Sequence, residues 1–242
     1  MAADAAFANG LLLVVAAVAG IVRGFAGFGG PMVILPVATA VLGPAAAVWV
    51  VLCADILVNV RLLPEVRGIA RRAVVVPLAI GSLLTLPIGS LALVSLDAEM
   101  VRRVICSAIL VASLVMLSGW RWRAELAPGQ WVAVGALTGL VMGLTSLAVT
   151  AALFLQSGKT SAAEARADFI VWVFITSLAL LAILTVQGGF PHGQAGAFLM
   201  VAPAYFAGTL AGARLHGRVS DATGRRVVLV LVAGIASIGL LR

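Results

Sequence analysis

Apolar stretches of membrane-spanning length, separated by short charged clusters, make up almost the whole chain. A helix needs about 20 apolar residues to cross a bilayer, and runs without any charged residue occur at 73–96, 104–120, 126–158, 169–213 and 227–241. The sequence Gln187-Gly-Gly-Phe-Pro-His-Gly193 is a turn signal that divides the run 169–213 into two spans. The pattern predicts an all-α, polytopic membrane helix bundle with segments at 6–42, 44–62, 73–96, 101–119, 130–157, 166–187, 193–213 and 225–241.

Composition supports a membrane protein and excludes a soluble domain. Hydrophobic residues make up 63% of the chain and charged residues 10%, with a mean hydropathy of +1.19. The amino terminus lacks the basic region of a cleaved signal peptide. The net charge of +7 is typical of basic loops that fix orientation and contact anionic headgroups, so we expect the lipid bilayer, and no nucleic acid, as a partner. We expect a multi-pass protein of the cell membrane, the inner membrane in a bacterium.

The chain resembles a duplication. The sequence Gly20-Ile-Val-Arg-Gly-Phe-Ala-Gly27 is similar to Gly139-Leu-Val-Met-Gly-Leu-Thr-Ser146, 119 positions later. Trp49 and Trp172 also correspond, 123 positions apart, and we interpret both as anchors at the membrane interface. We therefore predict two similar four-segment halves, 1–125 and 126–242, within one membrane domain.

Two topologies are compatible with these segments, and the positive-inside rule distinguishes them. If every segment crosses once, the basic residues other than Arg23 divide 7 against 8 between the faces, which violates the rule. If the first segment of each half enters, breaks and returns, the halves are inverted repeats and the split becomes 12 against 3. The smaller group is then Arg102, Arg103 and Arg242, and the larger comprises residues 61, 67, 71, 72, 121, 123, 159, 166, 214, 218, 225 and 226. The sequence favours re-entrant first segments with the basic face in the cytoplasm, although segment 130–157 is shorter than 6–42.

A glycine-rich break in the first segment points most directly to a function. The sequence Gly24-Phe-Ala-Gly-Phe-Gly-Gly-Pro-Met-Val-Ile-Leu-Pro36 holds four glycines and two prolines, which disfavour a straight helix. Lipid tolerates broken backbone only where it is buried in protein or lines a wet cavity. A helix that starts at Pro31 leaves free amides, and a helix amino terminus attracts anions. The candidate substrate-binding residues, including hydroxyls at the matching place in the second half, are Arg23, Gly27, Phe28, Gly29, Gly30, Pro31, Thr145, Ser146 and Thr150.

Close helix packing is the alternative explanation of these glycines. If the amides of the break bind an anion, a side chain added at Gly29 or Gly30 blocks its approach. Gly20→Ala, outside the break, is expected to be nearly silent by comparison.

Arg23 is the only charged residue between Ala5 and Ala54. An arginine deep in an apolar segment faces a partner or a wet cavity, and its planar fork suits the oxygens of sulfite, sulfonate or carboxylate. Pairing with Asp55 and snorkelling to an interface are the alternatives. Asp55 and Asn59 lie four residues apart on one helix face. Asp55 either carries a coupling proton or neutralises Arg23.

The remaining polar residues indicate neither catalysis nor metal binding. Cys53 and Cys106 lie in apolar runs without metal-ligand spacing, so we expect inert, buried thiols. The two histidines, His192 and His216, lie in loops. Since no nucleophile triad or carboxylate pair occurs at a workable spacing, we predict that the chain is not an enzyme and uses no metal or cofactor.

At these residues the chain resembles the sulfite exporter (TauE/SafE) family, over nearly its full length. The resemblance rests on the segment Gly24 to Pro36, on the duplicated halves and on the basic loop after the second segment. The second half departs from the family's glycine-rich repeat, because Thr145-Ser-Leu-Ala-Val-Thr150 stands where Gly-Gly-Pro is expected.

The resemblance implies a secondary transporter that exports small sulfur-containing or organic anions such as sulfite, sulfonates or sulfoacetate. We expect coupling to a proton or ion gradient and consider a homodimer as a possible assembly. An anion uniporter or channel, and a non-transporting structural membrane partner, are the alternative functions.

Overall fold

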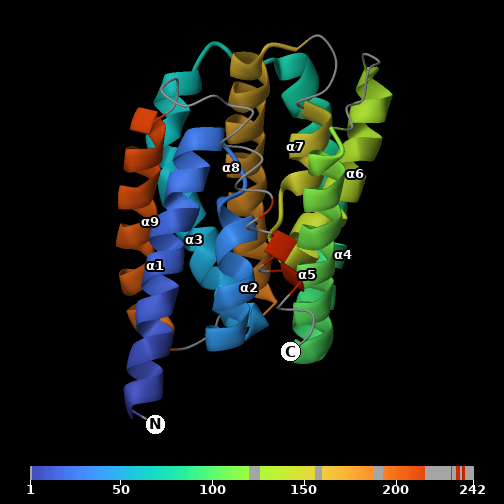
Figure 1. The fold of residues 1–242 in the computed structure, drawn as a ribbon. Coiled ribbons are helices and arrows are strands. Elements are labelled where there is room, and N and C mark those ends of the chain that lie inside the picture. The colour runs from blue at the N-terminus through green and yellow to red at the C-terminus, as the bar shows by residue number, and fades with distance from the viewer. Residues whose placement is uncertain are drawn as a thin grey trace.

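The computed structural model describes residues 2–119, 126–155, 160–187 and 193–215, together with Val230, Ala233, Gly234, Ala236 and Ser237. The predicted last segment, 225–241, therefore lies almost wholly outside the described residues, as do His192 and His216. The described part is a bundle of helices (Figure 1). Their bounds are α1 Ala2–Ala26, α2 Gly30–Leu42, α3 Pro44–Val66, α4 Arg72–Ser95, α5 Ala98–Leu117, α6 Pro128–Thr145, α7 Val149–Leu155, α8 Ala162–Val186 and α9 Ala195–Leu215.

Six of these helices are long and apolar enough to cross a membrane: α1, α3, α4, α5, α8 and α9. The chain is therefore a multi-pass membrane protein, and the predicted all-α membrane bundle is confirmed. The helix bounds agree with the predicted segments to within a few residues, except that both first segments consist of two helices each.

The predicted break in the first segment is present, and its backbone explains the glycines. Helix α1 ends at Ala26, and α2 begins at Gly30 with Pro31 in its first turn. Between them Gly27 and Gly29 have φ angles of 79° and 88°, a left-handed conformation that glycine adopts without the steric cost of a side chain. The second break is similar in kind, because Ser146 ends α6 with a φ of 56°.

The first segment turns back inside the bundle. Gly20 faces Tyr205 and Gly24 faces Thr209, so α1 and α9 run in the same direction. Helix α3 also runs parallel to α9, because Asp55 meets Tyr205 and the ends of both helices share a cavity. Since α1 and α3 have the same direction, the intervening α2 runs back toward the end at which α1 begins (Figure 1).

The first segment of the second half also turns back, in the opposite direction. Gly135 faces Leu78 and Gly139 faces Ser82, so α6 runs parallel to α4, whose direction is opposite to that of α3. Helix α8 also starts beside the start of α4, where Asp168 binds Arg71. Helices α6 and α8 both run away from that end, and α7, between them in sequence, runs back toward it (Figure 1). The two broken segments therefore have inverted orientations.

Each broken segment packs on a helix of the other half. Helix α1 lies against α9 and α6 lies against α4 (Figure 1), and glycines bring the backbones together. A methyl group at Gly20 would collide with the carbonyl oxygen of Tyr205. The expectation that Gly20→Ala is nearly silent is therefore wrong, because Gly20 lies in this close contact between helices.

Basic residues gather at one end of the bundle. This basic end is where α3 and α9 finish and where α4 and α8 start, and its described basic residues are Arg61, Arg67, Arg71, Arg72, Arg166 and Arg214. The opposite end holds Arg102 and Arg103, in the first turns of α5. For the described residues, this distribution of basic residues is the one that the re-entrant topology predicts.

We predict that the basic end faces the cytoplasm, because basic loops remain on that side. In a background without Cys53 and Cys106, Arg67→Cys and Arg214→Cys should both react with a membrane-impermeant thiol reagent only from the cytoplasmic side. Arg103→Cys, whose parent side chain is exposed at the other end, should react only from outside. Labelling of Arg67→Cys and Arg214→Cys from opposite sides would contradict the topology.

Candidate functional site

Arg23 lies in the last turn of α1, directly before the first break, and its side chain is 1% exposed. Its Nε donates a hydrogen bond to Oδ1 of Asp55 at 2.9 Å, and one terminal nitrogen donates to Oδ1 of Asn59 at 2.6 Å. The other terminal nitrogen donates to the carbonyl oxygen of Gly27. Arg23 therefore joins the break to α3, and the ion pair with Asp55, one of the sequence alternatives, is present.

Asp55 is the centre of this buried network. Besides Arg23, it accepts a hydrogen bond from Nδ2 of Asn59 at 3.0 Å and one from the hydroxyl of Tyr205 at 2.9 Å. Asp55, Asn59 and Tyr205 are at most 5% exposed. A carboxylate this far from water needs such partners, because an unpaired buried charge is costly. Helix α3 supplies two members, and α1 and α9 supply one each.

An aromatic ring lies against the guanidinium of Arg23. The ring of Phe169, from α8, lies with its centroid 5.4 Å from Cζ of Arg23, a distance at which a ring face attracts a cation. Phe169 also contacts Phe28 of the break, with centroids 6.3 Å apart, and Trp172 at 6.0 Å. The aromatic cluster brings α8, from the second half, against the first break.

Trp172 is not the interface anchor that the sequence suggested. The side chain of Trp172 is fully buried, and its indole nitrogen donates a hydrogen bond to Oγ of Ser82 on α4 at 3.1 Å. A buried tryptophan needs such an acceptor for its N–H group. Trp172 therefore supports the interior of the bundle, behind Phe169. Trp49 is half-buried and packs against Phe198.

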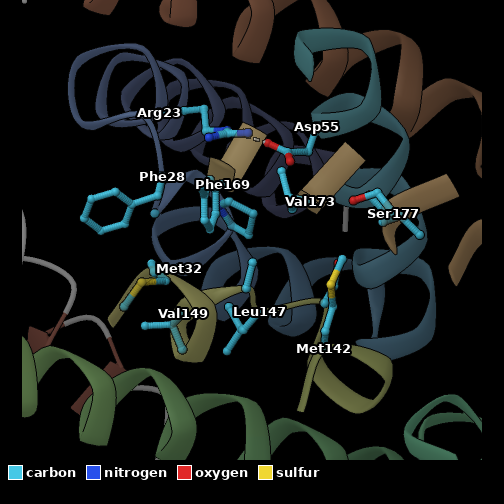
Figure 2. A pocket seen from close by; sticks show the side chains of 16 residues that line it. Arg23, Phe28, Met32, Asp55, Met142, Leu147, Val149, Phe169, Val173 and Ser177 are labelled. Atoms are coloured by element: carbon cyan, nitrogen blue, oxygen red, sulfur yellow. Dashed lines mark hydrogen bonds and ion pairs between the residues drawn. The ribbon is translucent and has the colours of Figure 1, made fainter. Parts of the chain in front are cut away.

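A small cavity lies between the two breaks (Figure 2). Arg23 and Asp55 lie on one side of it, opposite Leu147 and Val149 of the second break. Its volume is about 20 Å³, room for about one water molecule. The described conformation is therefore closed, and an anion of several heavy atoms enters only when the lining side chains move apart.

The structure brings most of the predicted site residues together at this cavity. Those that line it are Arg23, Phe28, Gly29, Pro31, Ser146 and Asp55. Gly27 and Asn59 contact Arg23 from outside the lining.

The remaining predicted residues have other surroundings. Gly30 is buried against Tyr205 and Arg23. Thr145 caps the end of α6, where its hydroxyl accepts a hydrogen bond from the amide of Leu147 at 3.2 Å. Thr150 is half-buried on α7 and is not part of the cavity lining.

The first break leaves backbone donors without partners. Within the described part of the chain, the amides of Phe28, Gly29 and Gly30 donate no backbone hydrogen bond across the turn. Phe28 and Gly29 belong to the cavity lining. Free amides at the start of α2 and a guanidinium within the same cavity are groups that bind the oxygens of an anion.

Sequence reasoning missed several residues of this site. Phe169, Tyr205 and Ser177 lie in long apolar helices, where nothing in the local pattern distinguishes them from lipid-facing or packing residues. Asp168 was also missed, and it is fully buried. Its Oδ2 accepts two hydrogen bonds from the guanidinium of Arg71, at 2.9 and 2.6 Å, and its Oδ1 accepts one from the backbone amide of Arg71. Its position in a charged cluster at the start of a helix made it resemble a solvated residue.

Comparison with known proteins gives one family. The family model described as "Sulfite exporter TauE/SafE" matches residues 12–238, nearly the whole chain. No curated protein and no solved structure matches the chain significantly.

Proposed function

Because the chain belongs to the sulfite exporter TauE/SafE family, whose members are exporter-type membrane transporters, we propose that it exports small sulfur-containing anions such as sulfite or sulfonates by secondary transport. One observation carries this proposal. The cavity between the two breaks holds Arg23 together with unpartnered amides of the first break. Inverted repeats with broken helices are a recurring transporter architecture, in which the substrate binds where the repeats meet.

The chemistry of the cavity suits a small oxyanion. Arg23 uses three of its five N–H donors on Asp55, Asn59 and Gly27, so at most two donors remain for a ligand. Guanidinium and amide groups match the oxygens of sulfite, sulfonate and carboxylate alike. The apolar side chains around them, among them Met32 and Leu147, strengthen these electrostatic contacts because they exclude water.

Charge balance supplies a coupling mechanism. Arg23 and Asp55 together are neutral, so a bound anion adds a buried negative charge, which is costly. If Asp55 takes up a proton, it releases Arg23 as a net positive partner for the anion. Proton and anion then bind together, and Asp55 carries the proton. Tyr205 and Asn59 hold the carboxyl group in place in either state.

A flux assay tests both the function and the coupling. In liposomes loaded with sulfite, wild-type protein should release the anion faster when a pH jump acidifies the compartment that holds it. Asp55→Asn imitates the protonated carboxyl group, so anion exchange should continue while the dependence on pH is lost. Glu65→Gln is the matched control, because Glu65 is an exposed carboxylate that pairs with Arg61 and should leave the pH response unchanged.

The other outcomes identify the alternatives. Wild-type flux that does not respond to the pH jump would indicate a uniporter or channel for the same anions. No flux of sulfite, sulfonates or acetate from protein that inserts normally would favour a structural membrane partner. Asp55→Asn protein that neither folds nor exchanges would show that Asp55 serves as the counter-ion of Arg23 and not as the proton carrier.

A further inference from the structure

Helix α8 presents one continuous stripe of side chains to the cavity. Phe169, Val173 and Ser177 line it, and their spacing of four residues places them on one helix face. Arg166 lies three residues before Phe169 on the same stripe, one turn nearer the basic end. The stripe therefore leads from Arg166, near that end, to the cavity that contains Arg23.

The side chain of Arg166 lies directly over the first break. Its Cγ, Cδ and Nε lie 3.1, 3.2 and 3.3 Å from the place that a Cβ atom on Gly27 would occupy. The carbonyl oxygen of Gly27 meanwhile accepts the hydrogen bond from Arg23. Two guanidinium groups thus approach one glycine of the break, and the absence of a side chain on Gly27 leaves the room for Arg166.

Arg166 differs from Arg23 in making no direct ion pair with a described residue. Within the described residues its guanidinium makes no hydrogen bond or ion pair, and the side chain is half-buried. The nearby carboxylates have other partners, because Asp168 binds Arg71 and Glu65 binds Arg61. A half-buried cation with free donors, close to a second cation, lies in a region of positive potential that favours an anion.

We propose that Arg166 forms an outer binding site for a small oxyanion, from which the anion passes along α8 to Arg23. This inference rests on the proposed function, and it adds a binding residue at the basic end of the path. Phe169 is the next side chain along the stripe, and its ring contacts both Phe28 and Arg23. The anion therefore binds at Arg166 first and reaches Arg23 when the rings of Phe28 and Phe169 move aside.

Kinetics with sulfite test the outer site. Arg166→Gln should raise the KM for sulfite supplied at the basic end by about tenfold or more, the scale of losing charge-assisted hydrogen bonds. The maximal rate should stay within about twofold, because the inner site is intact, and Arg166→Lys should restore part of the affinity. Arg67→Gln is the matched control, since it removes an exposed cation at the same end without releasing Glu65 from Arg61, and it should leave KM unchanged.

Each other outcome has a definite meaning. An unchanged KM in Arg166→Gln overturns the outer site, and an equal rise in Arg67→Gln overturns it in favour of a general surface potential. A loss of maximal rate at unchanged KM shows that Arg166 acts only on packing of the break. Wild-type protein without sulfite flux overturns the proposed function instead, and sulfite binding measured by thermal shift then decides on the outer site. In that measurement, sulfite that stabilises Arg166→Gln as much as it stabilises the wild-type protein overturns the outer site.

Discussion

Arg23→Ala is expected to abolish anion binding, while Arg23→Lys retains only a weak remainder. The guanidinium is the cationic group in the cavity lining, and its loss removes charge-assisted hydrogen bonds worth about 3 kcal/mol, or at least about 100-fold in affinity. Lysine keeps the charge but lacks the planar fork that reaches Asp55, Asn59 and Gly27 at once. Isothermal titration with sulfite, or a thermal-shift screen across sulfite, sulfate, taurine and acetate, measures the loss.

Arg23→Ala also leaves Asp55 buried without its counter-ion, a cost of about 3–5 kcal/mol. The double variant Arg23→Ala with Asp55→Asn removes both charges and should recover most of the stability without recovering anion binding. This separation is the control for the first result. Normal sulfite transport by Arg23→Ala would restrict Arg23 to a structural role, and recovery of binding in the double variant would place the anion elsewhere.

Gly30→Ala is expected to impair anion binding nearly as much as Arg23→Ala, because it displaces Tyr205. A Cβ atom at Gly30 would collide with the hydroxyl of Tyr205 and come within 3.0 Å of Cβ of Arg23. The tyrosine then has to move from Asp55, to which its hydroxyl donates. We expect a loss of about 1–3 kcal/mol in stability, typical of overpacking, and a loss of anion binding because Arg23 is displaced. Gly30→Val should cost more.

A double-mutant cycle with Tyr205→Phe measures this coupling. Tyr205→Phe removes the hydroxyl that meets the new methyl group, so the effects of the two substitutions on the melting temperature should be clearly non-additive. If the effects of Gly30→Ala and Tyr205→Phe simply add, the two residues are not coupled as described. Gly29→Ala is the useful comparison, because its added Cβ meets only Val22 at 3.7 Å and its penalty is the positive φ angle.

The outline of the site could be predicted because it depends on local chain chemistry. Glycine and proline mark the first break, its repeat in the sequence marks the second, and the distribution of arginines favours the segments that turn back. Asp55 and Asn59 share a helix face by their spacing alone. Gly29 and Gly27 have the positive φ angles that such a break requires.

The remaining contacts depend on which helices meet, and a single sequence carries little information about that. Tyr205 lies 150 positions from Asp55, and Phe169 lies in an apolar helix in which every aromatic residue has the same local signature. In the sequence, Arg166 resembles the basic loop residues that set the membrane orientation, because it stands in a charged cluster at the start of a helix. Gly20 resembles a neutral position until α9 is placed against it.

The glycine contacts of α1 with α9 and of α4 with α6 also determine which parts of the protein can move. In each pair two backbones touch without side chains between them, and such close-packed surfaces resist sliding. We therefore expect each pair to move as one rigid body that combines helices from both halves of the chain. Helices α3 and α8 contact each other between these bodies. We therefore expect the hinge of a transport cycle to run along α3 and α8, beside Arg23 and Asp55.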